Sequence, residues 1–229
     1  MALTDKIKAI ADAIRTKTGA TDVMTLDEMP NKIINIPSGT SGDSGVKKPY
    51  IEETYDKDGN LIAAKLVGYS FIRGSLFMYC SKLKLTEIPS EITYIGDSAF
   101  SACNELSLTS LPSGITYIGD SAFCECSNLS LTELPSSVTS IGSSAFIKCI
   151  KLESIDIPSN VMTIKSYAFA SCTNLTSIRF LGTPASISST IFYRCNNLTS
   201  IKVPWSEGAV ANAPWGAINA TITYDYTGE

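Results

Sequence analysis

Apolar positions recur along this chain with a fixed period of 23 residues. The period is marked by six cysteines, each with a phenylalanine three residues before it and a leucine three residues after it. The cysteines are Cys80, Cys103, Cys126, Cys149, Cys172 and Cys195. Because no insertion interrupts the six copies of F-x-x-C-x-x-L, the pattern indicates an internal structural repeat.

Each copy predicts two short extended segments and one turn. Residues Ser154–Ile157 and Ser177–Phe180 alternate between polar and apolar side chains, which predicts half-buried strands. A second extended piece, seen at Ile115–Ile118, is expected to turn at Gly119. There Asp120 or Ser121 is expected to cap a short helical turn that carries Ala122 and Phe123 inward.

A period of 23 residues predicts a repeat solenoid of the leucine-rich repeat kind, with six coils over residues 68–204. One unit cannot bury its apolar edge alone, so the coils are stable only as a stack. The unit from Leu134-Pro135 through Cys149 to Leu152 resembles the BspA-type leucine-rich repeat. That resemblance implies a right-handed solenoid, a role in adhesion or protein binding, and no catalytic residues.

Residues 1–36 have a different pattern, which predicts a small helical module. Leu3, Ile7, Ile10 and Ile14 form one apolar stripe on a helix, and a second, shorter helix follows a capping box at residues 25–28. The stripe packs within the module or on a neighbour in one interpretation, and supports self-association in the other. The segment also resembles a short N-terminal module of tail-associated proteins of bacteriophages and prophages, which implies attachment to other virion parts.

Between this module and the repeats we expect a Gly/Ser-rich linker (37–46) and a β-hairpin that caps the first coil (47–67). The hairpin strands are predicted at Tyr50–Tyr55 and Leu61–Val67. A calcium loop that starts at Asp56 would need a glutamate where the chain has Val67, which favours a plain turn.

Residues 205–229 break the period and predict a C-terminal cap. The segment Ala220–Tyr226 alternates as a closing strand. Trp205 and Trp215 are expected to seal the core of the last coil, and a ligand platform is the alternative.

Composition narrows the function classes. Of the 229 residues, 44% are hydrophobic and none is histidine, which removes the commonest general base and most zinc sites. A net charge of −4 gives no electrostatic reason to bind nucleic acid. With no catalytic motif or metal-ligand cluster, we expect a protein that is not an enzyme and uses no cofactor. We also expect no signal peptide, membrane span or membrane insertion, because charged residues interrupt the apolar runs.

The repeat cysteines are expected to be buried free thiols that pack as small apolar residues. Equivalent side chains in adjacent coils point in parallel, which disfavours disulfides between them. Cys124 lies off the repeat position, and we expect it to be the more accessible thiol.

One periodic set predicts a binding face. The strand position just before an inward apolar residue faces solvent and changes from acidic to basic along the array. The set is Glu87, Ser110, Glu133, Asp156, Arg179 and Lys202. Its partner would be a protein or glycan on a cell surface, and the alternative interpretation is a solvated face without a ligand. Two hypotheses follow for the whole chain: a virion-associated phage or prophage tail protein, or a cell-surface adhesin of the BspA type.

Overall fold

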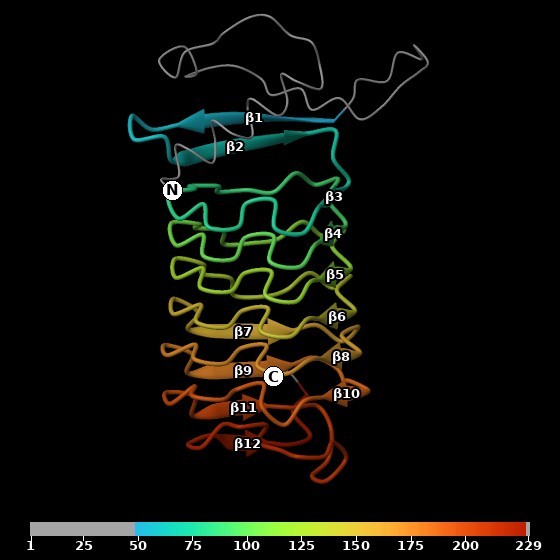
Figure 1. Cartoon of the computed structure of the whole chain (residues 1–229). Coiled ribbons are helices and arrows are strands. Elements are labelled where there is room, and N and C mark those ends of the chain that lie inside the picture. Colours follow the sequence, from blue (N-terminus) through green and yellow to red (C-terminus); the bar gives the residue numbers. More distant parts are fainter. Residues whose placement is uncertain (1–48, 228–229) are drawn as a thin grey trace, which may run out of the picture. The chain divides into compact units, whose positions relative to one another are not determined.

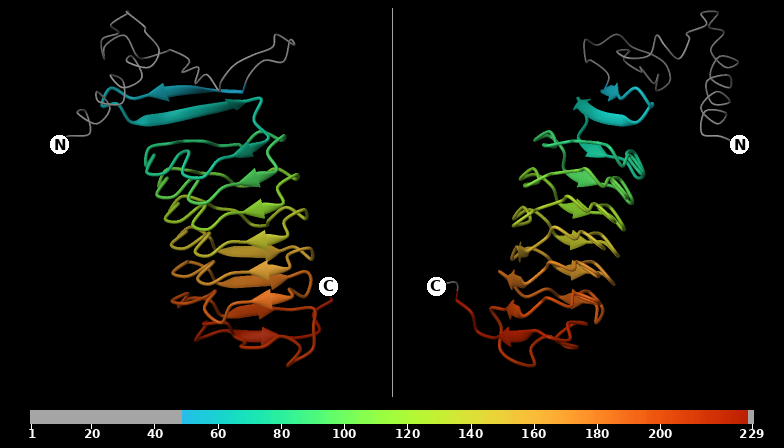
Figure 2. Two further views of the ribbon diagram at one scale, coloured as in Figure 1. Left: turned by 45° about the vertical axis from the view of Figure 1, so that its right-hand side comes forward. Right: turned by 90° about the vertical axis from the view of Figure 1, so that its left-hand side faces the viewer.

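The computed structural model describes residues 49–227, and the chain there forms a β-solenoid preceded by a hairpin (Figure 1). The predicted helical module with its apolar stripe and the predicted linker lie outside the described residues. Figure 2 shows the coils stacked one on another along the solenoid axis.

The hairpin consists of β1 (Tyr50–Tyr55) and β2 (Leu61–Val67), the two segments that the sequence predicts. The strands pair antiparallel, with Tyr50 opposite Val67. The Asp56 carboxylate closes the loop by accepting hydrogen bonds from the amides of Asp58 and Asn60, at 2.9 and 2.8 Å. These bonds lower the Asp56 pKa and confirm the plain turn.

The hairpin packs on the first coil. The Lys84 amide donates to the carbonyl oxygen of Ile62 at 2.9 Å, and Ala64 and Leu66 belong to the same apolar core as the coils. One strand therefore continues the stack and the other lies outside it, as a cap for a repeat array requires.

A narrow sheet of two-residue parallel strands runs the length of the repeats. It is formed by β3 (Phe71–Ile72), β4 (Tyr94–Ile95), β5 (Tyr117–Ile118), β6 (Ser140–Ile141), β8 (Thr163–Ile164) and β10 (Ser186–Ile187). Each strand pairs with the equivalent residues of the next coil, 23 residues later. The isoleucine of each strand points inward, and the preceding residue faces outward.

Glycine follows the isoleucine in three of these coils because the backbones approach closely. A side chain built at Gly119 would place its Cβ 2.6 Å from the backbone nitrogen of Asp97 in the preceding coil. Any larger residue would force the two coils apart.

A second, wide sheet forms only in the C-terminal half. Its parallel strands are β7 (Ser154–Ile157), β9 (Ser177–Phe180), β11 (Ser200–Lys202) and β12 (Thr221–Thr223), in that order. The bounds of β7 and β9 confirm the two strands predicted from alternation. The closing strand β12 is shorter than the predicted segment and pairs with β11.

The predicted helical turns are wrong: residues 49–227 contain no helix. The segment after each narrow strand is instead a series of tight turns, in which the Ala99 amide bonds to the Gly96 carbonyl and the Ser101 amide to the Ser98 carbonyl. Ser98 and Ala102 have positive φ (55° and 60°), which a right-handed helix excludes. Their amides bond instead to carbonyls of the next coil, at 2.8 and 2.7 Å, so this segment forms a third ladder between coils.

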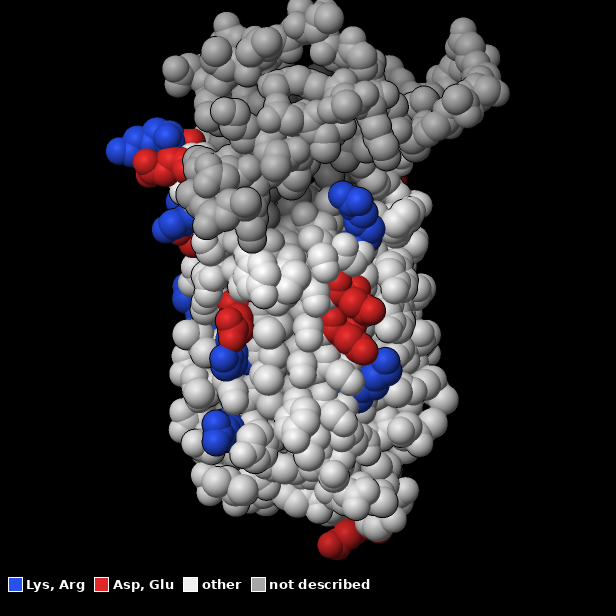
Figure 3. All heavy atoms as spheres, viewed as in Figure 1, with Lys and Arg blue, Asp and Glu red and all other residues white. Residues whose placement is uncertain are grey.

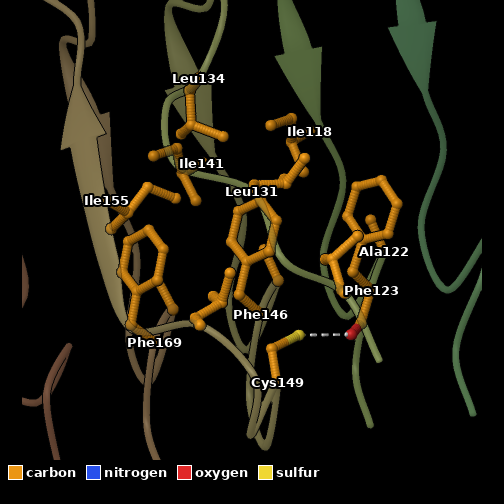
Figure 4. Packing of buried hydrophobic residues seen from close by; sticks show 14 of the residues in the cluster. Ile118, Ala122, Phe123, Leu131, Leu134, Ile141, Phe146, Cys149, Ile155 and Phe169 are labelled. Carbon is orange, nitrogen blue, oxygen red and sulfur yellow. Dashed lines mark hydrogen bonds between the residues drawn. The ribbon is translucent and has the colours of Figure 1, made fainter. Parts of the chain in front are cut away.

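The core is a set of columns, one residue from each coil. Phe77, Phe100, Phe123, Phe146 and Phe169 stack with ring centroids 5.2 to 5.4 Å apart. Figure 4 shows this column beside inward leucines and isoleucines of both strand segments. The phenylalanines and the repeat leucines are almost completely buried, which explains why their positions tolerate no insertion.

The cysteine column does more than fill space. The Cys149 thiol donates a hydrogen bond to the carbonyl oxygen of Phe123 in the preceding coil, with sulfur and oxygen 3.1 Å apart (Figure 4). Cys103, Cys126, Cys172 and Cys195 make the same bond, at 3.0 to 3.1 Å. Each thiol thus satisfies a buried carbonyl at the turn, a role that the sequence alone does not predict.

The C-terminal cap is built around two buried tryptophans, as predicted. Trp205 and Trp215 both pack on Phe180, at centroid distances of 5.4 and 5.8 Å. The Trp215 indole nitrogen donates to the Ala211 carbonyl oxygen at 2.8 Å, and its side chain is fully buried. These contacts make the pair the end of the core and leave no open platform for a ligand.

Candidate binding face

A groove with a volume of about 440 Å³ lies over the outer face of the wide sheet. It is lined by Thr132, Glu133, Ser154, Ile155, Asp156, Ser177, Ile178, Arg179, Ser200, Lys202 and Tyr226. The groove brings together four of the six residues that the sequence predicts as a binding face.

These four residues form one charged row, defined here as Glu133, Asp156, Arg179 and Lys202. Asp156, Arg179 and Lys202 are paired in register across β7, β9 and β11, and a backbone bridge joins Glu133 to Asp156. Each lies between two inward apolar residues, so the alternation of a strand directs its side chain outward. Glu133 is exposed and the other three are half-buried.

The middle of the row is an ion pair. The Arg179 Nε donates to the Asp156 Oδ1 at 3.1 Å, and its Nη2 contacts Oδ2. This carboxylate, and after it the Tyr226 side chain, raises the pKa of Arg179 above its ordinary value. The two central charges therefore neutralise each other within the groove.

The ends of the row have opposite charges. Glu133 carries the negative charge at the end toward the N-terminal coils. At the other end, the Lys202 ammonium lies 4.7 Å from the centroid of the Tyr226 ring. The groove is thus acidic at one end and basic at the other.

A second row, of hydroxyl groups, runs beside the charged row. Ser154, Ser177 and Ser200 occupy equivalent positions of β7, β9 and β11, two residues before the charged row and on the same face. A serine two residues before an outward charge is visible in three copies of the repeat, so the sequence held a signal for this row. The contribution of Tyr226 had none, because Tyr226 follows the last repeat.

The other two predicted residues lie elsewhere. Glu87 and Ser110 are exposed and line a separate groove of about 780 Å³ between β2 and the first two coils. The structure therefore divides the predicted face into two grooves, and only the one over the wide sheet collects charges of both signs in consecutive strands.

Charged side chains are sparse on the face that Figure 3 shows, where small groups of acidic and basic residues are separated by uncharged surface. A few charges can therefore determine how a partner lies on a given area of the solenoid.

An aromatic row also reaches the surface, on the narrow sheet. Phe71, Tyr94 and Tyr117 are outward neighbours in β3, β4 and β5. The Tyr94 and Tyr117 rings stack 4.9 Å apart and nearly parallel, so these faces cover each other. The sequence analysis did not single out this row, although its 23-residue spacing is visible.

The thiols offer no reactive centre. All seven cysteines are free. Burial raises the pKa of Cys103 to about 12 and also raises that of the half-buried Cys80 and Cys124. Cys124 is more exposed than the inner repeat cysteines, as predicted, but Cys80 is comparably exposed because no preceding coil covers it.

Among residues 49–227, no group of acidic residues and cysteines is arranged to hold a metal ion. In the same range, no helix has the length and apolar character needed to cross a membrane.

Comparisons with known proteins agree on the fold. Residues 70–199 match, in six copies, the family described as BspA type leucine rich repeat region. No curated protein matches the chain.

Two solved structures are similar. A leucine-rich repeat protein from Bacteroides ovatus is 25% identical with a TM-score of 0.51, and the match covers 69% of this chain but 46% of that one. A leucine-rich repeat protein from T. pallidum is 24% identical with a TM-score of 0.54, over 67% of this chain and 81% of that one. The chain thus spans less than half the length of the Bacteroides ovatus protein.

Proposed function

Because the chain belongs to the BspA-type leucine-rich repeat family, we propose that it is a binding protein without catalytic activity that recognises a protein or glycan on a cell surface. The observation that supports this function best is the groove over the wide sheet, which unites Glu133, Asp156, Arg179 and Lys202. These residues come from four different coils, so only the folded array presents them together.

The finer part of the proposal is that the protein is associated with a phage or prophage tail. It rests on the resemblance of residues 5–33 to N-terminal modules of tail-associated proteins. In this arrangement the N-terminal module docks to the particle, with self-association through its apolar stripe as an option, and the solenoid is displayed to the host.

Cell binding by the full chain tests the binding function. We would label the full chain with a fluorophore and measure its binding to a panel of intact Gram-negative and Gram-positive bacteria. Ser177→Trp would fill the centre of the groove, since Ser177 faces outward on β9, and we expect it to reduce binding at least about tenfold.

The matched control is Ser140→Trp, which places the same bulk at an outward, half-buried strand position of the narrow sheet. Circular dichroism would verify that both variants fold. Unchanged cell binding by a folded Ser177→Trp variant would overturn the assignment of the groove.

The gene neighbourhood tests the tail association. We expect genes for virion structural proteins beside the gene for this chain. Their absence would refute the tail association and leave the binding function intact.

A further inference from the structure

We propose that the groove over the wide sheet binds an extended polypeptide segment that carries one basic and one acidic side chain four residues apart. This inference rests on the proposed function and adds the chemistry of the partner. The basic side chain faces Glu133 and the acidic one faces Lys202.

The spacing follows from the stacking of the coils. Glu133, Asp156, Arg179 and Lys202 occupy four consecutive rungs. Neighbouring strands lie about 4.8 Å apart, so the two ends of the row are separated by roughly 14 Å. An extended chain advances about 3.4 Å per residue, and side chains four residues apart lie on the same face at roughly the same separation.

The centre of the groove sets the residue between the two charges. Asp156 and Arg179 are bonded to each other and offer no net charge to a ligand. A charged side chain there would have to compete with the existing pair, so we expect a small, uncharged residue at the middle position. Ser154, Ser177 and Ser200 supply hydroxyl groups that can bond to the amides and carbonyls of the bound backbone.

The same geometry favours a polypeptide over a glycan. Sugar rings commonly need an aromatic face to stack on, and Tyr226, the aromatic residue that lines the groove, lies against Lys202. Anionic sugars would also meet the negative charge of Glu133 at the other end. A segment with both signs of charge complements both ends at once.

Peptide probes test the inference directly. We would immobilise seven-residue Ser/Thr peptides that carry Lys and Asp four residues apart, Lys and Asp adjacent, two Lys four residues apart, or two Asp four residues apart. Binding of the labelled full chain at low salt should favour the first probe over each of the others by about fivefold or more.

Charge reversal should change the preferred probe. Lys202→Glu makes both ends acidic and should shift the preference to the probe with two Lys, whereas Glu133→Lys should shift it to the probe with two Asp. Glu87→Lys is the matched control: it has the same repeat position and the same change of net charge but lines the other groove, so the preference should not move. A change of preference cannot arise from misfolding, which would remove binding to every probe.

The outcomes separate this inference from the proposed function. If Ser177→Trp abolishes cell binding but no probe is selected, or if treating the cells with periodate and not with protease removes binding, the ligand is a glycan and this inference fails. If cell binding ignores every groove variant, the proposed function of the groove fails. If Glu87→Lys changes the preference as Glu133→Lys does, the effect is net charge, and the assignment to the row fails.

Discussion

The three N-terminal coils (80–148) and the three C-terminal coils (149–217) share one core but differ on the face that carries the candidate site. In the N-terminal coils, the inward residues after the leucine lie five and eight positions beyond the cysteine: Leu85 and Ile88, Leu108 and Leu111, Leu131 and Leu134. In the C-terminal coils they lie six and eight positions beyond it: Ile155 and Ile157, Ile178 and Phe180, Ile201 and Val203. All twelve are buried.

A shift of one residue thus decides whether a strand forms. Side chains in a strand alternate, so two inward residues can belong to one strand only when they are two positions apart. In the N-terminal coils the spacing of three leaves two adjacent exposed residues, such as Thr109 and Ser110, and no strand is present there. The wide sheet and its groove therefore lie over the C-terminal half, although the repeat length is constant throughout.

The largest expected effect tests the part that the halves share. Phe123→Ala in an N-terminal coil and Phe169→Ala in a C-terminal coil should each lower the free energy of unfolding by about 3–5 kcal/mol, because both delete a fully buried ring from the same column. Urea unfolding followed by circular dichroism measures both. A markedly smaller loss for one of them would show that the halves do not share one core.

The next prediction exchanges the two patterns. Ser154→Leu combined with Ile155→Thr gives the first C-terminal coil the spacing of an N-terminal coil. We expect β7 to be lost and the free energy of unfolding to fall by about 2–3 kcal/mol, because the ladder to β9 and the Asp156–Arg179 geometry are disturbed. Hydrogen exchange should be faster at the amides of β9 that pair with β7.

The converse variant is the control for this exchange. Leu131→Ser combined with Thr132→Ile gives the third N-terminal coil the spacing of a strand, and we expect it to lengthen the wide sheet by one strand beside β7. Unchanged protection of β9 in the first variant and of β7 in the second would show that inward spacing does not determine the sheet.

The sequence predicted those features that depend on local alternation or on the period. The bounds of β7 and β9, the hairpin strands and the outward position of the charged row all follow from side chains that alternate along one segment. The division into two halves was also present in the sequence, as the position of one inward residue, but a consensus written for the whole array averages over it.

The tight turns could not be predicted in the same way. The left-handed positions include Ser98, Ala102, Ser121 and Glu125, none of which is a residue type that favours positive φ. Hydrogen bonds to the next coil hold them there, so their conformation is a property of the stack. Tyr226 entered the groove for a related reason: its amide bonds to the Val203 carbonyl, a contact across the cap that no repeat pattern contains.

The smallest expected effect concerns the cysteine column, which the two halves share except at its first member. Cys149→Ala removes a buried thiol and leaves the Phe123 carbonyl without its donor, so it should cost about 1–2 kcal/mol of unfolding free energy. Cys80 is half-buried, and among residues 49–227 its thiol donates no such bond, so Cys80→Ala should cost less than half as much. Cys149→Ser keeps a donor and should recover part of the loss, which separates the hydrogen bond from the volume of the sulfur. Equal losses for Cys149→Ala and Cys80→Ala would mean that the thiols act only as apolar filling, and that the stacking of coils does not depend on the bond each thiol makes to the coil before it.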